Sequence, residues 1–289
     1  LPAVAYNDRG GNFSQNSTAL GGLKYAYMDS AGAWNVEVVD INYGTAACGS
    51  GTTALLYSFC VGAPVTAAAL NSYVSVRLAF RSDGTPVIAY VYGGTGVVAG
   101  SALTRQIRFA ERSTSGVWTI SAAYSSTTTS ATATANAIKT VSMVLDSSDR
   151  PHIFFAATTG SALLANTFSL FYLFRDSDGI WSNTNVSSTV TGAGNSPYLN
   201  NGFALTAVGQ GPNWNEAVRC SGDGSIYVTA ASQTGAAAAS PLLFRCDVSG
   251  TTGACSTWSF LHMTSTGAGL TAGQYCAGGT GCITAATAG

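Results

Sequence analysis

Short apolar runs alternate with polar turns along this chain, and this pattern predicts β-strands. The clearest case is residues 81–90 (RSDGTPVIAY), which read as a strand end, a tight Asp-Gly-Thr-Pro turn and the start of the next strand. The same layout recurs at residues 146–155 and 221–229. A further copy is split between residues 286–289 and residues 1–6, at the two ends of the chain.

Each copy continues with a strand centred on an aromatic residue, a small turn and, after it, a Trp that begins another strand. One repeat therefore has four strands: A before the first turn, B after it, then the aromatic strand C and the Trp strand D. The B strands start at residues 2, 86, 151 and 225, and the spacing across the joined chain ends matches the others in size. The central aromatic residues are Tyr25, Phe109, Tyr172 and Phe244, and the Trp residues are Trp34, Trp118, Trp181 and Trp258.

Four-stranded units that repeat at this scale indicate a β-propeller. We expect an all-β fold in which residues 1–289 form a single domain of four four-stranded blades. Because open strand edges are a liability, residues 283–287 are expected to pair beside residues 2–6 and close the ring. A fragment cut in phase from a longer tandem array has the same periodicity, and this alternative stays open. The expected blades are residues 283–289 with 1–40, residues 73–124, residues 141–187 and residues 216–264.

Composition narrows the classes of partner. Only 9% of the residues are charged, against about 25% in an average protein, and the net charge is −1. No basic run exists, which argues against nucleic acid as a partner. No apolar run approaches about 18 residues, so membrane insertion is not expected. A homo-oligomer and a place within a larger chain both stay open, and we expect no cofactor and no metal.

The seven cysteines fit a secreted or surface-displayed protein. They form no CxxC motif, and the two His are too few to complete a usual zinc site. Three pairs are close in sequence, and we expect each to form a local disulfide: Cys48–Cys60, Cys246–Cys255 and Cys276–Cys282. Cys220 is left over and is interpreted as a buried apolar residue. The alternative, seven reduced cysteines in a reducing compartment, stays open.

Loop length indicates where a binding site lies. The A–B and C–D turns are short in nearly every repeat, whereas the B–C and D–A connections are long and emerge at the opposite end of the sheets. Residues 52–70 lie in one such connection, have no counterpart in the other repeats and predict an extra hairpin. Long loops on a rigid scaffold are a common place for binding. We expect ligand contacts from Asp8, Arg9, Tyr43, Tyr92, Arg105, Tyr198, Asn200, Asn201, Trp214 and Tyr275. Tyr57 and Phe203 are expected on the same face.

Aromatic rings that stack on sugars, beside Asn, Asp and Arg that bond hydroxyl groups, are typical of neutral glycan binding. Each aromatic side chain has the alternative role of packing its own loop. Residues 176–179 (DSDG) match the start of a calcium loop, but they lack its third Asp and its terminal Glu. We interpret them as a polar β-turn.

The repeat resembles that of secreted bacterial β-propellers, with the pattern D-x-x-G-x-P-H-I-A-Y followed by L-x-Y-A-x-R-D-x-x-G-x-W. Residues 83–90 and 151–153 carry the first half, and residues 23–27 and 175–181 carry the second. The C–D turns are also similar to degenerate Asp boxes of sialidase-type propellers, which are structural turns. The resemblance covers nearly the whole chain and implies the fold, but it leaves adhesin, lectin and enzyme scaffold open.

The residues favour binding over catalysis. The chain has three Glu, no GxSxG elbow and no His-centred triad, and its strand A arginines (Arg77, Arg81 and Arg219) occur in only two repeats. We therefore predict an extracellular adhesion or binding module for a glycan or another cell-surface ligand. A sialidase-like glycoside hydrolase and a structural surface repeat without a small ligand are the alternatives.

Overall fold

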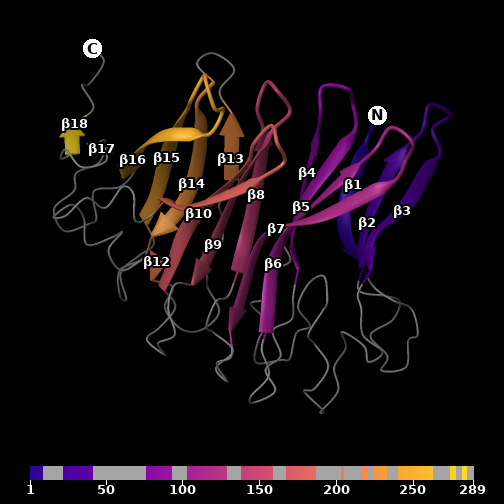
Figure 1. Cartoon of the computed structure of the whole chain (residues 1–289), viewed down its shortest axis with the longest axis horizontal. Coiled ribbons are helices and arrows are strands. Elements are labelled where there is room, and N and C mark those ends of the chain that lie inside the picture. Colours follow the sequence, from indigo (N-terminus) through magenta and orange to yellow (C-terminus); the bar gives the residue numbers. More distant parts are fainter. Residues whose placement is uncertain are drawn as a thin grey trace. The chain divides into compact units, whose positions relative to one another are not determined.

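The chain folds into antiparallel β-sheets (Figure 1). The computed structural model describes residues 1–8, 22–41, 76–92, 103–128, 138–158, 167–186, 203–204, 216–219, 224–232, 240–262, 274–277 and 282–284. Within these ranges every element is a β-strand, which confirms the all-β prediction. The chain divides into two compact units, Leu1–Val141 and Ser142–Gly289, and each is described by itself.

The first unit contains two up-and-down sheets. The first sheet has the order β1-β2-β3, and the second has the order β4-β5-β6-β7. The second sheet is a complete A–B–C–D repeat, whereas the first has only the strands B, C and D. The strands are β1 (Ala3–Asp8), β2 (Gly22–Met28), β3 (Trp34–Ile41), β4 (Val76–Phe80), β5 (Pro86–Tyr92), β6 (Leu103–Arg112) and β7 (Trp118–Thr128).

Two further sheets contain the remaining strands. The third sheet has the order β11-β10-β9-β8, with β12 also pairing with β10, and the fourth runs β13-β14-β15-β16-β17-β18. Both contain the predicted A–B–C–D order. The strands are β8 (Ile138–Leu145), which spans the unit boundary, β9 (Pro151–Thr158), β10 (Thr167–Arg175), β11 (Trp181–Asn185), β12 (Phe203–Ala204), β13 (Glu216–Arg219), β14 (Ile226–Ser232), β15 (Ser240–Val248), β16 (Cys255–His262), β17 (Gln274–Ala277) and β18 (Cys282–Thr284).

One turn geometry serves both the A–B and the C–D connections. In the turn that begins at Asp29, the backbone N–H of Asp29 donates to the Ala33 carbonyl (2.9 Å) and that of Gly32 donates back to Asp29 (3.0 Å). Gly32 has a φ of 82°, a left-handed conformation that glycine adopts without steric cost. Turns with the same bonds begin at Arg81, Ser113, Asp146 and Asp176.

The turn at residues 176–179 is structural, as the sequence predicted. The Asp176 carboxylate accepts the backbone N–H groups of Asp178 (3.0 Å) and Ile180 (2.8 Å). The Asp29 carboxylate makes the same two bonds in its own turn. The acidic side chain therefore fixes the turn by satisfying its backbone donors.

The first and second sheets pack face to face around an apolar core. Leu23 and Tyr25 of β2 lie against Ile88 and Tyr90 of β5, and all four are buried. Side chains alternate along each strand, so the opposite face of the first sheet carries a separate row. In that row Trp34, Val36 and Val38 of β3 are more than half exposed among the residues that the structure describes.

The predicted ring closure is not what the strand pairing shows. Ile283 and Thr284 pair with Tyr275 and Gln274 inside the fourth sheet, whereas the prediction placed residues 283–287 beside residues 2–6. The first sheet correspondingly has three strands, with no strand A among the described residues. Only residues 278–281 separate β17 from β18, so this hairpin costs much less chain entropy than joining the chain ends.

Phe244 lies in strand C of the fourth sheet, as predicted, but its register differs from that of the other strand C aromatics. In the third sheet Tyr172 and Trp181 lie on opposite faces, because Trp181 pairs with Arg175, three residues from Tyr172. In the fourth sheet Trp258 pairs with Cys246, two residues from Phe244, which puts Phe244 and Trp258 on the same face. A one-residue offset in aligning the repeats is enough to exchange the faces.

Candidate functional site

Each sheet has a turn end, where A–B and C–D turns lie, and a long-loop end, where strand B ends and strand C begins (Figure 1). Toward the long-loop end of the first unit, the last residues of β3 and β5 meet the middle of β6, which begins three residues before its first pairing with β5. Here Asp40 accepts a hydrogen bond from the Tyr90 hydroxyl. It also forms an ion pair with Arg108, whose Nη1 donates to the carboxylate (2.8 Å). Asp40 is only 6% exposed, so the two donors compensate a buried carboxylate.

Arg108 connects this buried pair to the surface. Its guanidinium carbon lies 3.2 Å from the centroid of the Tyr92 ring, a cation–π contact, and its Nε donates to Gln106 Oε1 (2.9 Å). Gln106 Nε2 in turn donates to Ser125 Oγ (3.1 Å) on β7. The Arg108 side chain is 21% exposed, whereas Tyr92 is buried. We name Asp40, Tyr90, Tyr92, Gln106 and Arg108 the long-loop cluster.

The electrostatics of the long-loop cluster favour binding over proton transfer. Burial, together with the charge and hydrogen bond of Asp40, raises the pKa of Tyr90, so the phenol stays neutral and donates to the carboxylate. Burial alone would lower the pKa of Arg108, but its hydrogen bond with Asp40 raises it overall, so the guanidinium stays charged. The cluster thus offers a fixed cation on an aromatic ring, with no proton to exchange near neutral pH.

Among the predicted contact residues, Tyr92 belongs to the long-loop cluster. It is buried, and its ring packs against the guanidinium of Arg108. Asp8 ends β1 and Arg105 lies in β6, both at the same end of the first unit, and their side chains lie outside the described residues. Tyr275 lies in β17 opposite Ile283. Phe203 is in β12 and pairs with Phe168. Outside the described residues lie Arg9, Tyr43, Tyr57, Tyr198, Asn200, Asn201 and Trp214, as does the expected hairpin at residues 52–70.

Sequence reasoning missed Asp40, Tyr90, Gln106 and Arg108. A signal was present, because Asp40 interrupts an apolar strand (Val-Val-Asp-Ile), where a buried charge needs a partner. Tyr90 and Arg108 are cross-strand neighbours in the predicted hairpin of strands B and C. Their common partner, however, is on another sheet.

At the turn end of the first unit, Glu37 of β3 joins the two sheets. It accepts two bonds from Arg112 (2.8 and 2.6 Å) and one from the Trp118 indole (2.8 Å). Burial would raise the pKa of Glu37, but these hydrogen bonds hold it below its ordinary value. Arg81 forms an ion pair with Glu111 within the second sheet. Arg81, one of the three strand A arginines considered for a sialidase-like site, is therefore held in an ion pair within its own sheet.

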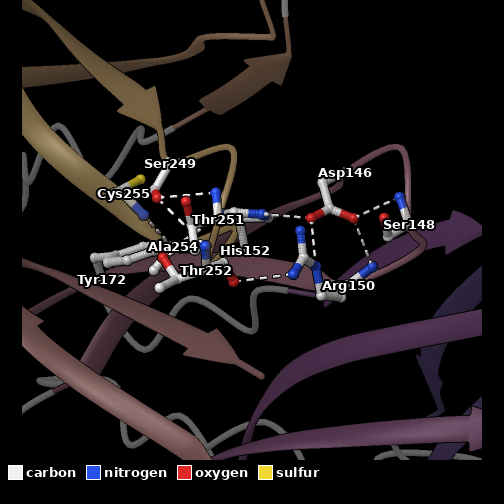
Figure 2. Close-up of polar contacts among 10 residues, drawn as sticks. All are labelled: Asp146, Ser148, Arg150, His152, Tyr172, Ser249, Thr251, Thr252, Ala254 and Cys255. Atoms are coloured by element: carbon white, nitrogen blue, oxygen red, sulfur yellow. Dashed lines mark hydrogen bonds and ion pairs between the residues drawn. The ribbon is translucent and has the colours of Figure 1, made fainter. Parts of the chain in front are cut away.

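The turn end of the second unit holds a buried polar network (Figure 2). Asp146 accepts the Arg150 Nε (2.7 Å) and lies 3.5 Å from His152 Nε2, and His152 Nδ1 lies 2.9 Å from the Tyr172 hydroxyl. The Tyr172 oxygen also accepts the backbone N–H of Cys255 (3.1 Å). A carboxylate only accepts, so Asp146 near Nε2 favours the imidazole proton on that nitrogen, and Nδ1 is then the acceptor of the Tyr172 hydroxyl proton.

This network is closed to substrates. His152 and Tyr172 are 0% and 3% exposed, and burial raises the pKa of Tyr172. Burial would also raise the pKa of Asp146, but His152, Arg150 and two backbone N–H groups hold it well below its ordinary value. The arrangement stabilises a carboxylate between sheets, and it presents no nucleophile to solvent.

The Cys246–Cys255 disulfide is present, as predicted. Cys276 and Cys282 are direct partners in the β17–β18 register, so that pair stays a prediction supported by backbone placement. Cys48, Cys60 and Cys220 lie outside the described residues. No group of acidic, His and Cys side chains suited to a metal ion occurs in the described part of the chain.

The fold and these clusters define a class, namely an all-β protein of repeated antiparallel sheets joined by charged and aromatic contacts. Comparison with family models, with characterised proteins and with solved structures gave no match. The described residues contain no helix of the length and apolarity needed to cross a bilayer.

Proposed function

We propose that this protein is an extracellular binding or adhesion module that recognises a glycan or another cell-surface ligand at its long-loop end. The observation that carries the proposal is Arg108, held on the Tyr92 ring and paired with buried Asp40 close to the ends of β3 and β5, from which long connections follow. A side chain fixed in this way loses little entropy when a ligand binds. Its N–H groups suit the hydroxyl and carbonyl oxygens of a sugar.

Secretion is part of the proposal. The Cys246–Cys255 disulfide supports it, because disulfides form in oxidising compartments. The low charge supports a ligand that is bound by neutral contacts. Single contacts of this kind are weak, and we expect dissociation constants of about 1 μM to 1 mM, with avidity from repetition.

We further propose that the four sheets are the blades of one β-propeller. The support is the A–B–C–D order of the second, third and fourth sheets, the turn that the first three sheets share, and one aromatic contact that recurs in both units with the same geometry: Tyr25 to Trp118, and Tyr172 to Trp258. Small-angle scattering tests this, because a compact 289-residue chain has a radius of gyration of about 19 Å. A clearly larger value, varying with solvent conditions, would reject a closed ring.

A glycan array, run in parallel with a fluorogenic glycoside screen, tests the function. Arg108→Gln is the informative variant, and Arg81→Gln is its matched control. Both arginines are partly exposed (21% and 25%) and paired with an acidic residue, but Arg81 lies at the turn end. We expect Arg108→Gln to weaken glycan binding at least tenfold and Arg81→Gln to leave it unchanged.

Equal loss in both variants would reject the long-loop cluster as the binding site. Turnover of a glycoside that one acidic substitution abolishes would establish the enzyme instead. No glycan binding and no glycoside turnover, together with self-association detected by light scattering, would favour a structural repeat.

A further inference from the structure

The turn between β15 and β16 differs from the other C–D turns. It is longer, covering residues 249–254, and the Cys246–Cys255 disulfide spans its base. Inside the loop, the Ser249 N–H donates to the Ala254 carbonyl (2.9 Å), and the Gly253 N–H donates to the Ser249 carbonyl (2.7 Å). These bonds and the covalent link give the turn one shape, which presents the Thr252 carbonyl and the Cys255 N–H outward from the fourth sheet.

Both presented groups bind the third sheet (Figure 2). Arg150 Nη1 donates to the Thr252 carbonyl (2.9 Å), and the Cys255 N–H donates to the Tyr172 hydroxyl (3.1 Å). Arg150 also lies directly on Gly253, where an added Cβ would be 1.8 Å from the guanidinium. Gly253 has a φ of 75°, so both its backbone and its space require glycine.

These contacts form a closed circuit. From Tyr172 it passes through His152, Asp146 and Arg150 to Thr252, and it returns through Cys255 to Tyr172. Two of its links cross between the sheets, and both are made by the disulfide-bonded turn. Loss of the turn conformation would remove the Thr252 carbonyl from Arg150 and the Cys255 N–H from Tyr172, and the buried Tyr172 hydroxyl would lose one of its hydrogen-bond partners.

We propose that the Cys246–Cys255 disulfide is a thiol-exchange site, and that its oxidation state decides whether the β15–β16 turn is clamped to the third sheet. Cys246 is 0% exposed, whereas Cys255 is partly exposed at the start of β16. In this proposal Cys255 is the half of the disulfide that an incoming thiolate attacks, because it is the more exposed residue. The reductant is a dithiol.

The exchange is balanced. One thiolate of the dithiol attacks Cys255 Sγ, a mixed disulfide forms, and the Cys246 sulfur leaves as a thiolate and takes a proton. The second thiol of the reductant then displaces the Cys255 sulfur, which is also protonated. Two electrons and two protons pass from the dithiol to the protein, and the dithiol becomes a disulfide. Reoxidation reverses each step and restores the clamp.

Hydrogen exchange of the Cys255 amide, resolved by mass spectrometry, is the direct test on the full chain. In the oxidised protein this N–H is held by Tyr172, and we expect dithiothreitol to accelerate its exchange at least tenfold. Peptide mapping of the same samples shows which disulfide has opened. The amides around Trp118 in the first unit serve as an internal reference and should not change.

Three variants make the test specific. Cys246→Ala with Cys255→Ala should exchange fast at position 255 with or without the dithiol. Gly253→Ala should accelerate exchange at Cys255 while the disulfide stays closed, because its Cβ displaces Arg150. Gly84→Ala is the matched control, since Gly84 has a similar φ of 83° and nothing within 4 Å of the added Cβ. It should leave Cys255 unchanged.

An exchange rate at Cys255 that stays within twofold on opening of the disulfide would overturn the proposal. Equal effects of Gly253→Ala and Gly84→Ala would overturn the role of Arg150 in the clamp. If the double cysteine variant does not fold, graded reduction of the wild-type protein decides the same question, because the fraction of open Cys246–Cys255 is measured directly.

Discussion

The indole of Trp118 meets the ring of Tyr25 edge-on, with ring centroids 5.5 Å apart and planes at 69°, and Trp258 meets Tyr172 with the same distance and angle. In each pair a strand D Trp packs on the strand C aromatic of another sheet. Trp34 is the equivalent residue of the first sheet, and it is 53% exposed. The strand D Trp of the repeat is therefore buried in one sheet, at Trp258, and exposed in another, at Trp34.

This difference predicts unequal costs of truncation. Trp258→Ala removes a ring that is 8% exposed and should cost about 3–5 kcal/mol of unfolding free energy. Trp34→Ala removes a ring that keeps more than half its surface in water and should cost less than about 1 kcal/mol. Chemical denaturation followed by circular dichroism measures both. Equal costs would mean that Trp34 is covered in solution.

The lowered pKa of Asp146 predicts that the protein loses stability at acidic pH. Its lowered folded-state pKa means that folding favours the carboxylate, a contribution that is complete above the ordinary pKa of about 4. The contribution is lost as pH falls through the lower folded-state value. We expect the wild-type Tm to drop as the pH falls below about 4, and Asp146→Asn to start lower at neutral pH and to drop less. Parallel curves for the two proteins would assign the loss of stability at acidic pH to other carboxylates.

Asp149 is the only non-glycine residue with positive φ in the described part of the chain, at 60°. Gly84 occupies the equivalent position in the second sheet, with a φ of 83°. Asp149→Gly should therefore stabilise the protein by about 0.5–1 kcal/mol, and the reciprocal Gly84→Asp should destabilise it by a similar amount. Thermal unfolding followed by calorimetry measures the change in stability of both variants. Destabilisation by Asp149→Gly would show that the Asp149 side chain contributes more than the backbone strain costs.

Tyr90→Phe tests the buried pair of the long-loop cluster. The variant keeps the ring and removes the hydroxyl donor to Asp40, which then depends on Arg108 alone. We expect a loss of about 1–2 kcal/mol, measured by urea unfolding. A loss below about 0.3 kcal/mol would indicate that water replaces the hydroxyl, and that the carboxylate is more accessible than its 6% exposure implies.

Thiol titration in denaturant tests the cysteine scheme. Seven cysteines with three local disulfides leave one thiol, assigned to Cys220. The Cys246–Cys255 bond alone would leave five, and seven thiols would contradict the disulfide of the structure. Peptide mapping without reduction identifies the pairs.

Local features of the fold could be predicted from sequence. The turns at Asp29, Arg81 and Asp146 were evident because glycine, Asp and Ser specify them within five residues. The A–B–C–D pairing within a sheet followed from these turns. The place of residues 282–284 did not follow, because the regular spacing of repeats gave no information about a short competing hairpin.

Contacts between sheets were beyond sequence pattern. Asp40 and Arg108 are far apart along the chain, as are Glu37 and Arg112, and no periodicity links them. The side of the sheet on which Phe244 lies could not be predicted for a different reason. A one-residue offset between repeats exchanges the faces of a strand, and neither composition nor repeat spacing reveals such an offset.

The ion pairs described above have a consequence for how this protein meets a partner. Within the part of the chain that the structure describes, Arg81, Arg108, Arg112, Arg150 and Arg245 are each paired with a nearby carboxylate. Opposite charges a few ångströms apart produce a field that decays quickly with distance, and a net charge of −1 adds little beyond it. A partner therefore approaches without electrostatic guidance. Association rate constants should stay near 10⁵–10⁶ M⁻¹s⁻¹, about the same at 20 mM and at 500 mM salt, and selectivity is left to how long the complex lasts.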